Sequence, residues 1–270
     1  MRITHNVPSM HTQGALFTNN RAVAKDLEKL STGLRINRAS DDAAGLAISE
    51  GLRTQVRGVE QAKKNALDGV SALNIAEGAL NEVHNIMQRQ RELAIQSSTA
   101  TYSDTERAYM NQEYDALNSE ITRIVSSTNF NGIKLLVGTA FNTNHLWIDA
   151  NSLKKVDAIT ISYYDQVGSI NGEVSSQSGA EKLIGTMDEE IRKVSSARAD
   201  IGALVNRLET TINNLTVSVV NQQAAETQIR DVDFAYQSSN FTKNQILTQS
   251  ATAMLSQANA STQGVLSLIR

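Results

Sequence analysis

Residues 184–219 read IGTMDEEIRKVSSARADIGALVNRLETTINNLTVSV, and the apolar residues in this stretch recur in alternating steps of three and four. The positions in phase are Ile184, Met187, Ile191, Val194, Ile201, Val205, Leu208, Ile212, Leu215 and Val219, and only Arg198 breaks the phase. A heptad pattern sustained over this length is typical of helices that pack against each other along their whole length. The stretch therefore predicts a long return helix in a helical bundle.

A second long helix is predicted N-terminal to this one. Its apolar residues share one phase and are Leu52, Val56, Val59, Ala66, Val70, Leu73, Leu80 and Met87, with Lys63, Glu77 and His84 as polar interruptions. The pattern predicts a helix of about 50 residues, roughly 75 Å long, that ends near residues 99–102. Ser103 and Glu106 then match a capping box. The next helix has its predicted seam at Met110, Tyr114, Leu117, Ile121 and Ile124.

The middle of the chain has a different character. The turn signal Asn131-Gly132 precedes three short segments rich in β-branched residues, at 133–137, 145–149 and 156–164. We expect these segments to form short antiparallel strands or hairpins, within a β region at about residues 131–170.

The two ends of the chain lack charge. No Lys, Arg, Asp or Glu occurs from Ile3 to Asn20, and Lys243 is the one charged residue from Phe234 to Ile269. Half of the C-terminal segment is Ser, Thr, Asn or Gln, which would suit a disordered tail. Heptads favour paired helices instead. They comprise Leu16, Asn20, Val23, Leu27, Leu30 and Leu34 at one end, and Leu247, Ala251, Met254, Ala258, Ser261, Val265 and Leu268 at the other.

The expected fold class is therefore mainly α: a long antiparallel coiled-coil or helical-bundle rod, a small β-hairpin region at its turn, and paired N- and C-terminal helices. We expect residues 1–40 and 231–270 to form a terminal coiled coil, and residues 41–230 to form a helical rod domain.

Composition excludes several classes of function. The 270 residues contain no Cys, and His5, His11, His84 and His145 have no metal-ligand spacing. A sequence pI of about 5.9 argues against a nucleic-acid partner, and no stretch approaches the roughly 20 apolar residues of a membrane span. Phosphate-binding loops, nucleophile elbows and HExxH are absent from the sequence. We expect no catalytic site, cofactor or metal, and therefore no enzyme.

Two classes of function remain for a helical chain with apolar, uncharged ends. One is a self-assembling structural subunit, because head-to-tail association would cover the faces that a lone helix pair leaves open. The other is a coiled-coil adaptor or signalling module, whose exposed helices should carry charges beside the seam. The charge-free ends favour the self-assembling subunit.

Six motifs resemble the bacterial flagellins, over about residues 1–140 and 180–270. They are LEKLSTGLRIN (27–37), DDAAGLAI (41–48), MQRQRELAIQ (87–96), NFNG (129–132), QANA (257–260) and VLSL (265–268). The resemblance implies a subunit of the flagellar filament used for swimming motility, in a short form without variable outer domains. The terminal helices would form the inner tube, the helical body the outer tube, and about residues 33–47 the spoke between them. A hook-filament junction protein shares some of these features and remains the alternative within the assembly class.

The resemblance also assigns roles to residues. The implied polymerisation core is Leu16, Val23, Leu27, Leu30, Leu34, Leu247, Ala251, Met254, Ala258, Val265 and Leu268. The implied spoke or inter-subunit contacts are Arg35, Arg38, Asp41 and Asp42. Arg89, Leu93 and Glu113 match positions that contact a vertebrate Toll-like receptor in some flagellins, and contacts between protofilaments are the alternative role for them.

Partners and location follow from the same resemblance. The expected partners are other copies of the chain, a flagellar export chaperone, the hook-associated and cap proteins, sister flagellins and, for a host-associated bacterium, the Toll-like receptor. The chain would leave the cell unfolded through flagellar type III export, without a cleaved signal peptide, and would act outside the cell in the flagellum. Neither nucleic acid nor membrane is an expected partner.

Overall fold

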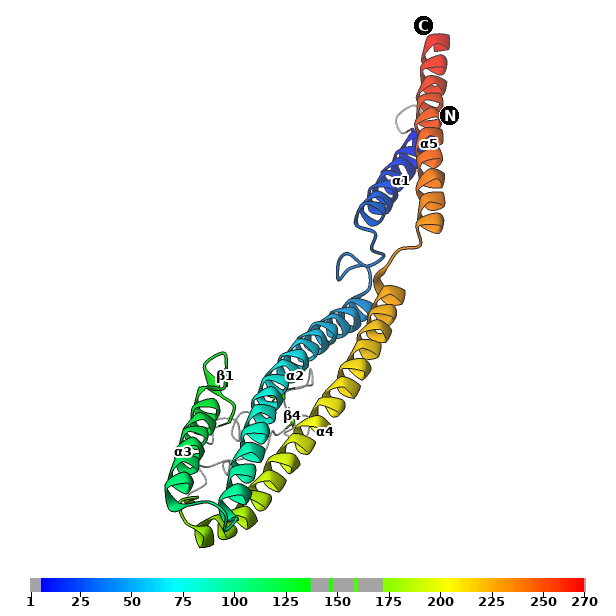
Figure 1. Cartoon of the computed structure of the whole chain (residues 1–270). Coiled ribbons are helices and arrows are strands. Elements are labelled where there is room, and N and C mark those ends of the chain that lie inside the picture. The colour runs from blue at the N-terminus through cyan, green and yellow to red at the C-terminus, as the bar shows by residue number, and fades with distance from the viewer. Residues whose placement is uncertain (1–5, 137–145, 148–157, 160–171, 270) are drawn as a thin grey trace. The chain divides into compact units, whose positions relative to one another are not determined.

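The computed structural model describes residues 6–136, 146–147, 158–159 and 172–269, and within them the chain is mainly α-helical (Figure 1). The elements are α1 Val7–Thr32, α2 Ala43–Ser98, α3 Asp104–Ser127, β1 Asn129–Phe130, β2 Ile133–Lys134, β3 Leu146–Trp147, β4 Ala158–Ile159, α4 Gln177–Arg230 and α5 Phe234–Ile269. The predicted fold class is confirmed, including the long helices and the short antiparallel strands. The other residues of the strands expected at 133–137, 145–149 and 156–164 lie outside the described residues, apart from Leu135 and Leu136, which follow β2 as a bend.

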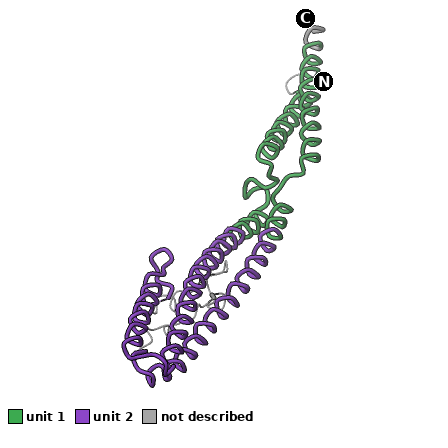
Figure 2. The backbone as a smooth tube through the Cα atoms, in the orientation of Figure 1, with its two compact units in different colours: residues 1–54, 221–270 green, residues 55–220 purple. Residues whose placement is uncertain are grey.

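The chain divides into two compact units (Figure 2). Unit 1 comprises residues 1–54 and 221–270, and unit 2 comprises residues 55–220. Unit 1 therefore combines segments from the two ends of the sequence, whereas unit 2 is one continuous stretch.

Unit 2 is built on α2, α3 and α4, whose predicted seams form its core. Met87, Tyr114, Met187 and Val194 each have 0% exposed surface and belong to one cluster of buried residues. A second cluster joins Ala66 and Leu73 of α2 to Leu208 of α4. The heptads thus correctly identified the faces that these helices bury.

Two sets of hydrogen bonds stabilise the turn between α2 and α3. The capping box predicted at Ser103 and Glu106 is present, with the Ser103 hydroxyl accepting from the Glu106 backbone N–H and the Glu106 carboxylate accepting from the Ser103 N–H. In addition Arg107, only 4% exposed, donates to the carbonyl oxygens of Thr99 and Tyr102 at 3.0 and 3.1 Å. A buried guanidinium thereby satisfies carbonyl groups beyond the end of α2.

The Asn131-Gly132 turn joins β1 to β2 as an antiparallel pair in which Phe130 faces Ile133. Asn131 has φ +51° and Gly132 has φ +79°. Positive φ at both central residues is the combination that a tight type I′ hairpin requires, which explains why the chain turns at this dipeptide. The separate pair β3 and β4 is also antiparallel.

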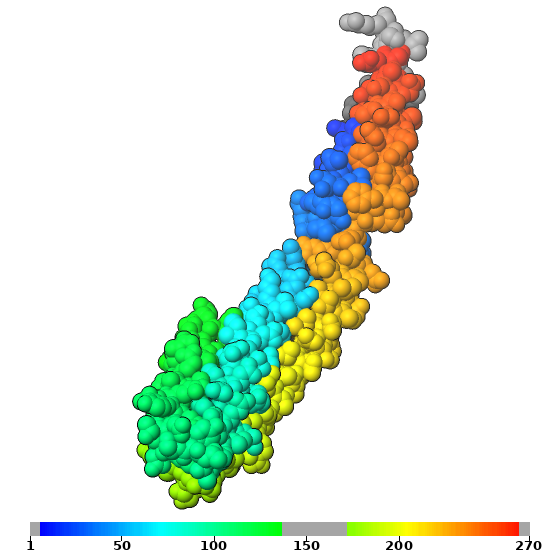
Figure 3. All heavy atoms as spheres, in the orientation of Figure 1, coloured from blue at the N-terminus to red at the C-terminus, as the bar shows by residue number. Residues whose placement is uncertain are grey.

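Unit 1 contains the terminal helices, which lie side by side (Figures 1 and 3). Asn6 caps α1 by accepting from the Ser9 N–H at 3.1 Å, and Gly33 ends α1 in the left-handed conformation at φ +72°. The chain then forms an antiparallel bridge between Leu34 and Asp231. This bridge brings the end of α1 beside the start of α5.

Candidate functional site

The interface between α1 and α5 combines apolar and polar side chains. No residue of α1 is fully buried, and Gln237 of α5 is 6% exposed. The half-buried residues on the facing sides are Ser9, Thr12, Leu16, Asn19, Val23, Asp26 and Leu30 on α1, and Phe241, Asn244, Thr248, Ala251, Leu255, Ala258 and Thr262 on α5. The Asn6 side chain donates to the Ala258 carbonyl at 3.1 Å at the far end of the pair. Half-buried apolar side chains and polar contacts therefore hold this interface together.

The structure corrects one part of the sequence interpretation. A single seam is predicted on each terminal helix, but the structure divides each seam between two faces. Leu16, Val23, Leu30, Leu34, Ala251 and Ala258 are half-buried, whereas Asn20, Leu27, Leu247, Met254 and Ser261 are exposed. The contact seam uses Asn19 and Asp26 of α1 and Thr248 and Leu255 of α5 in place of the adjacent predicted positions, which are left on a neighbouring face. The side chains of Val265 and Leu268 lie outside the described part of the chain.

Both terminal helices consequently carry uncovered apolar side chains. On α1, Met10 and Phe17 are each 65% exposed, and the Arg21 guanidinium lies 5.8 Å from the centroid of the Phe17 ring. On α5, Tyr236, Ile246, Leu247 and Met254 are between 41% and 68% exposed. Exposed apolar surface on this helix pair makes it the candidate interaction site of the described residues.

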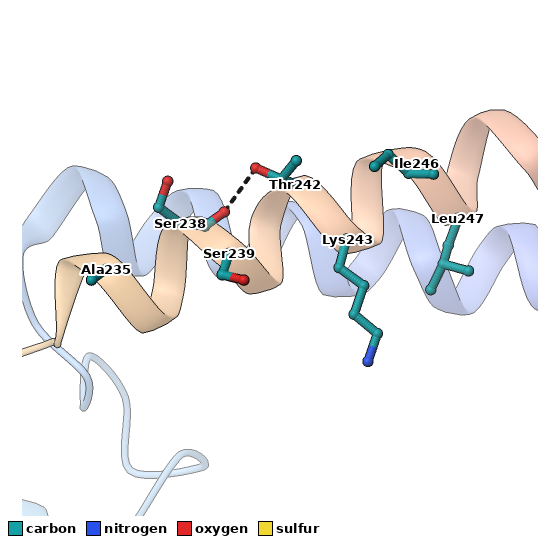
Figure 4. Close-up of a pocket in the computed structure, with 7 residues that line it drawn as sticks. All are labelled: Ala235, Ser238, Ser239, Thr242, Lys243, Ile246 and Leu247. Atoms are coloured by element: carbon teal, nitrogen blue, oxygen red, sulfur yellow. Dashed lines mark hydrogen bonds between the residues drawn. The ribbon is translucent and has the colours of Figure 1, made fainter.

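An open groove of about 650 Å³ runs along α5 (Figure 4). It is lined by Ala235, Ser238, Ser239, Thr242, Lys243, Ile246 and Leu247. The side chains of Lys243 and Leu247 extend to the same side of the helix, and the Thr242 hydroxyl bonds to the Ser238 carbonyl at 2.9 Å. Among the described residues Lys243 has no ion-pair partner. The groove is therefore apolar at one end and carries one unpaired cation.

The loop after α1 is held in place by charged side chains. Lys25 Nζ lies 2.7 Å from Asp41 Oδ1, and Arg38 Nη2 lies 3.0 Å from Glu28 Oε1. Asp41 Oδ2 also accepts from the backbone N–H groups of Asn37 and Arg38, each at 3.3 Å. The hydrogen bond from Lys25 is the main cause that holds the pKa of Asp41 below its ordinary value.

The same loop is tied to the end of α4 inside unit 1. The backbone N–H of Arg35 donates to the Arg230 carbonyl at 2.7 Å, and the Arg35 guanidinium donates to the Ile229 carbonyl. Arg230 in turn pairs with Glu50 at 2.7 Å, which lowers the pKa of that carboxyl. These contacts order residues 33–42 within the chain itself.

Each of the four predicted spoke residues therefore has a partner in its own chain. Asp42 accepts from the Gly45 N–H at 2.8 Å and so caps the start of α2. The Arg38 side chain is 71% exposed, whereas that of Asp41 is 12% exposed. Of these two side chains, Arg38 offers much more surface for contact with another molecule.

Arg89 and Glu113 come together on the surface of unit 2. Arg89 Nη2 lies 2.9 Å from Glu113 Oε1, and Glu92 lies 3.2 Å from Arg89 Nη1. These bonds, first to Glu113 and then to Glu92, raise the pKa of the Arg89 guanidinium. Leu93, in contrast, is 1% exposed and packs in the core. Its side chain is therefore almost entirely closed to a partner, whereas those of Arg89 and Glu113 are open.

Comparison with known proteins assigns a family. Residues 3–140 match the model of the bacterial flagellin N-terminal helical region, and residues 184–269 match that of the C-terminal helical region. The chain belongs to the bacterial flagellin family. It is 46% identical over 277 residues to a flagellin of Halalkalibacterium halodurans and 43% identical over 286 residues to a flagellar filament core protein of Treponema maltophilum, and both matches cover 100% of each chain.

Flagellin membership accords with the absence of a catalytic constellation from the sequence, since flagellins are structural proteins. A solved structure from Vibrio parahaemolyticus, described as a flagellar hook-associated protein, has a TM-score of 0.60 and 14% identity, and it covers 71% of this chain and 100% of its own. That likeness shows a shared fold alone.

Within the described residues, no group of three or more His, Cys, Asp and Glu could hold a metal ion. No described helix is long and apolar enough to cross a membrane.

Proposed function

We propose that the chain is a structural subunit that assembles with copies of itself into a flagellar filament used for swimming. The observation that carries this proposal is the apolar surface that α1 and α5 leave uncovered. Full-length similarity to proteins named flagellin and flagellar filament core protein supports it.

Association is favourable because it removes this surface from water. Full burial of a large apolar side chain contributes roughly 1.5–3 kcal/mol, and Met10, Phe17, Ile246 and Met254 are each more than half exposed. A second copy of the chain is a fitting partner, because its terminal helices carry the same uncharged, apolar faces. Since the faces of α1 and α5 differ, contact between them is heterologous, and a heterologous contact whose rotation does not close into a ring builds an open helical polymer.

The terminal helices are the proposed filament core, with residues 1–40 and 231–270 inside, residues 41–230 outside and about residues 33–47 as the spoke. Arg38 is the proposed spoke contact with the greatest exposure, and Arg89 with Glu113 forms the proposed surface for a neighbouring protofilament or an innate receptor. We also propose that the chain is exported by the flagellar type III route and acts outside the cell. Its further proposed partners are an export chaperone, hook-associated and cap proteins, and sister flagellins.

The proposal is tested with purified full-length chain and a variant that lacks residues 234–270. Full-length protein should form long filaments on seeding, visible by electron microscopy. The truncated variant should remain monomeric while unit 2 keeps its thermal unfolding transition, because its core lies within residues 55–220. Long filaments from the truncated variant would disprove the role of α5.

A further inference from the structure

Asp26 on α1 binds two amide side chains of α5 at once. Gln237 Nε2 donates to Asp26 Oδ1 at 2.6 Å, and Asn244 Nδ2 donates to Asp26 Oδ2 at 2.7 Å. Asp26 is half-buried and Gln237 is 6% exposed. Within the described residues no Lys or Arg lies within ion-pairing distance of this carboxylate. Asp26 is therefore held by amides in the interface rather than by a cation.

Apolar burial alone does not explain the face that α5 presents to α1. The face in contact has Phe241, Thr248 and Leu255, whereas an adjacent face has Leu247 and Met254, which are 41% and 59% exposed. Both faces carry large apolar side chains, so apolar burial does not by itself select between them. Another interaction must select the face that meets α1.

The Asp26 carboxylate supplies that interaction. Gln237 and Asn244 are seven residues apart, so they share one face of α5 and are separated by about 10.5 Å along its axis. Only a narrow range of rotation and sliding allows both amides to reach one carboxylate. Hydrogen bonds to a carboxylate are shorter and stronger than those between neutral groups, so the loss of both is costly.

We propose that Asp26 is a positioning residue that selects which face of α5 meets α1, and so keeps Leu247 and Met254 outward for a second copy of the chain. A single polar residue at a helix seam can fix register and orientation in this way, at some cost in stability. This inference rests on the proposed function, since it names the residue that presents the assembly surface.

The first test uses the Asp26→Leu variant and the oxidation of Met254 by peroxide in the monomer, followed by mass spectrometry. Without the carboxylate, α5 should be free to turn Leu247 and Met254 toward α1, and oxidation of Met254 should become at least about twofold slower. Asp68→Asn, which removes one exposed carboxylate from α2, is the control and should leave the rate unchanged. An unchanged Met254 rate in Asp26→Leu would overturn the proposal.

The second test is a rescue. Asn244→Asp places a second carboxylate opposite Asp26, so the critical concentration for filament growth should rise about tenfold or more. Adding Asp26→Asn to this variant exchanges the two groups, so that position 244 carries the carboxylate and positions 26 and 237 carry amides. The critical concentration of this double variant should return to near the wild-type value. The proposal fails if Asn244→Asp grows like wild type or if the double variant does not recover.

Failure of the proposed function and failure of the role of Asp26 give different results. If the wild-type chain forms no filaments, the proposed function fails, while Met254 oxidation in the monomer still tests Asp26. If wild type assembles and all Asp26 and Asn244 variants behave alike, only the role of Asp26 fails.

Discussion

Replacing Leu208 by Asp should destabilise unit 2 severely. Leu208 has 0% exposed surface and packs with Ala66 and Leu73 of α2. Loss of the buried side chain costs about 2 kcal/mol. Burial would raise the pKa of the new carboxyl by about three units, which is about 4 kcal/mol at neutral pH. Because half-buried residues around the cluster let water approach, we expect a total loss of about 4 to 6 kcal/mol.

The assay is urea unfolding of the purified monomer, followed by far-ultraviolet circular dichroism. Thr210→Asp is the matched control, since Thr210 is exposed two residues away on the same helix, and its effect should stay within about 0.5 kcal/mol. A loss of about 4 kcal/mol or more would consume much of the stability of an ordinary domain, so the unit 2 transition should shift strongly or disappear for Leu208→Asp. Similar shifts for the two variants would refute the assignment of the α4 seam.

Three further outcomes are expected. The Arg91 side chain lies 2.6 Å from Asp188 and lowers its pKa below the ordinary 3.8, so this pair stabilises unit 2 above about that pH and loses its effect as pH falls through the lowered pKa. Acid titration of Asp188→Asn should then show a weaker dependence on pH below about 4 than wild type does. Asp42→Lys should lower the free energy of unfolding by about 1 kcal/mol, because it removes the cap on the Gly45 N–H, while Asp42→Asn should retain it. A charge reversal at Asp42 thus changes the stability of the fold as well as any contact between subunits. Equal thermal stability of Asp42→Lys and Asp42→Asn would contradict the capping role. Arg89→Glu should change thermal stability by less than about 1 kcal/mol, since its ion pair is exposed, yet reduce swimming if the residue meets a neighbouring subunit; normal swimming by such cells would count against that contact.

The sequence predicts the interior of unit 2 well, because the apolar heptad positions of its helices lie on the faces that the helices bury. Met187, Val194 and Leu208 follow the heptad of α4, and all three are buried. Ser103 and Glu106 are equally predictable, since a capping box is a local arrangement of four residues.

The terminal helices are harder to predict, because a heptad shows where apolar residues recur and not which of two adjacent faces meets the partner. Leu247 and Ala251 belong to one pattern, yet the first is exposed and the second is half-buried. The deciding group, Asp26, contacts residues more than 200 positions away in the sequence. The amides Gln237 and Asn244, seven residues apart, are the signal that could have indicated it.

The burial of single residues such as Leu93 and Arg107 is also hard to predict. Sequence similarity groups Leu93 with Arg89 and Glu113, but on α2 Leu93 lies on the buried face. Arg107 has no sequence signal for burial, because the carbonyl groups that it serves are defined only by the turn between α2 and α3.

In the proposed filament, the exposed faces of α1 and α5 are covered when copies of the chain assemble. The most direct test is methionine oxidation in monomer and filament, measured by mass spectrometry. Met10 and Met254 are 65% and 59% exposed in the chain, whereas Met87 and Met187 are 0% exposed and serve as internal controls. We predict that Met10 and Met254 oxidise rapidly in the monomer and become protected in the filament, while the two controls are protected in both. Filaments in which Met10 and Met254 oxidise as fast as in the monomer would contradict the claim.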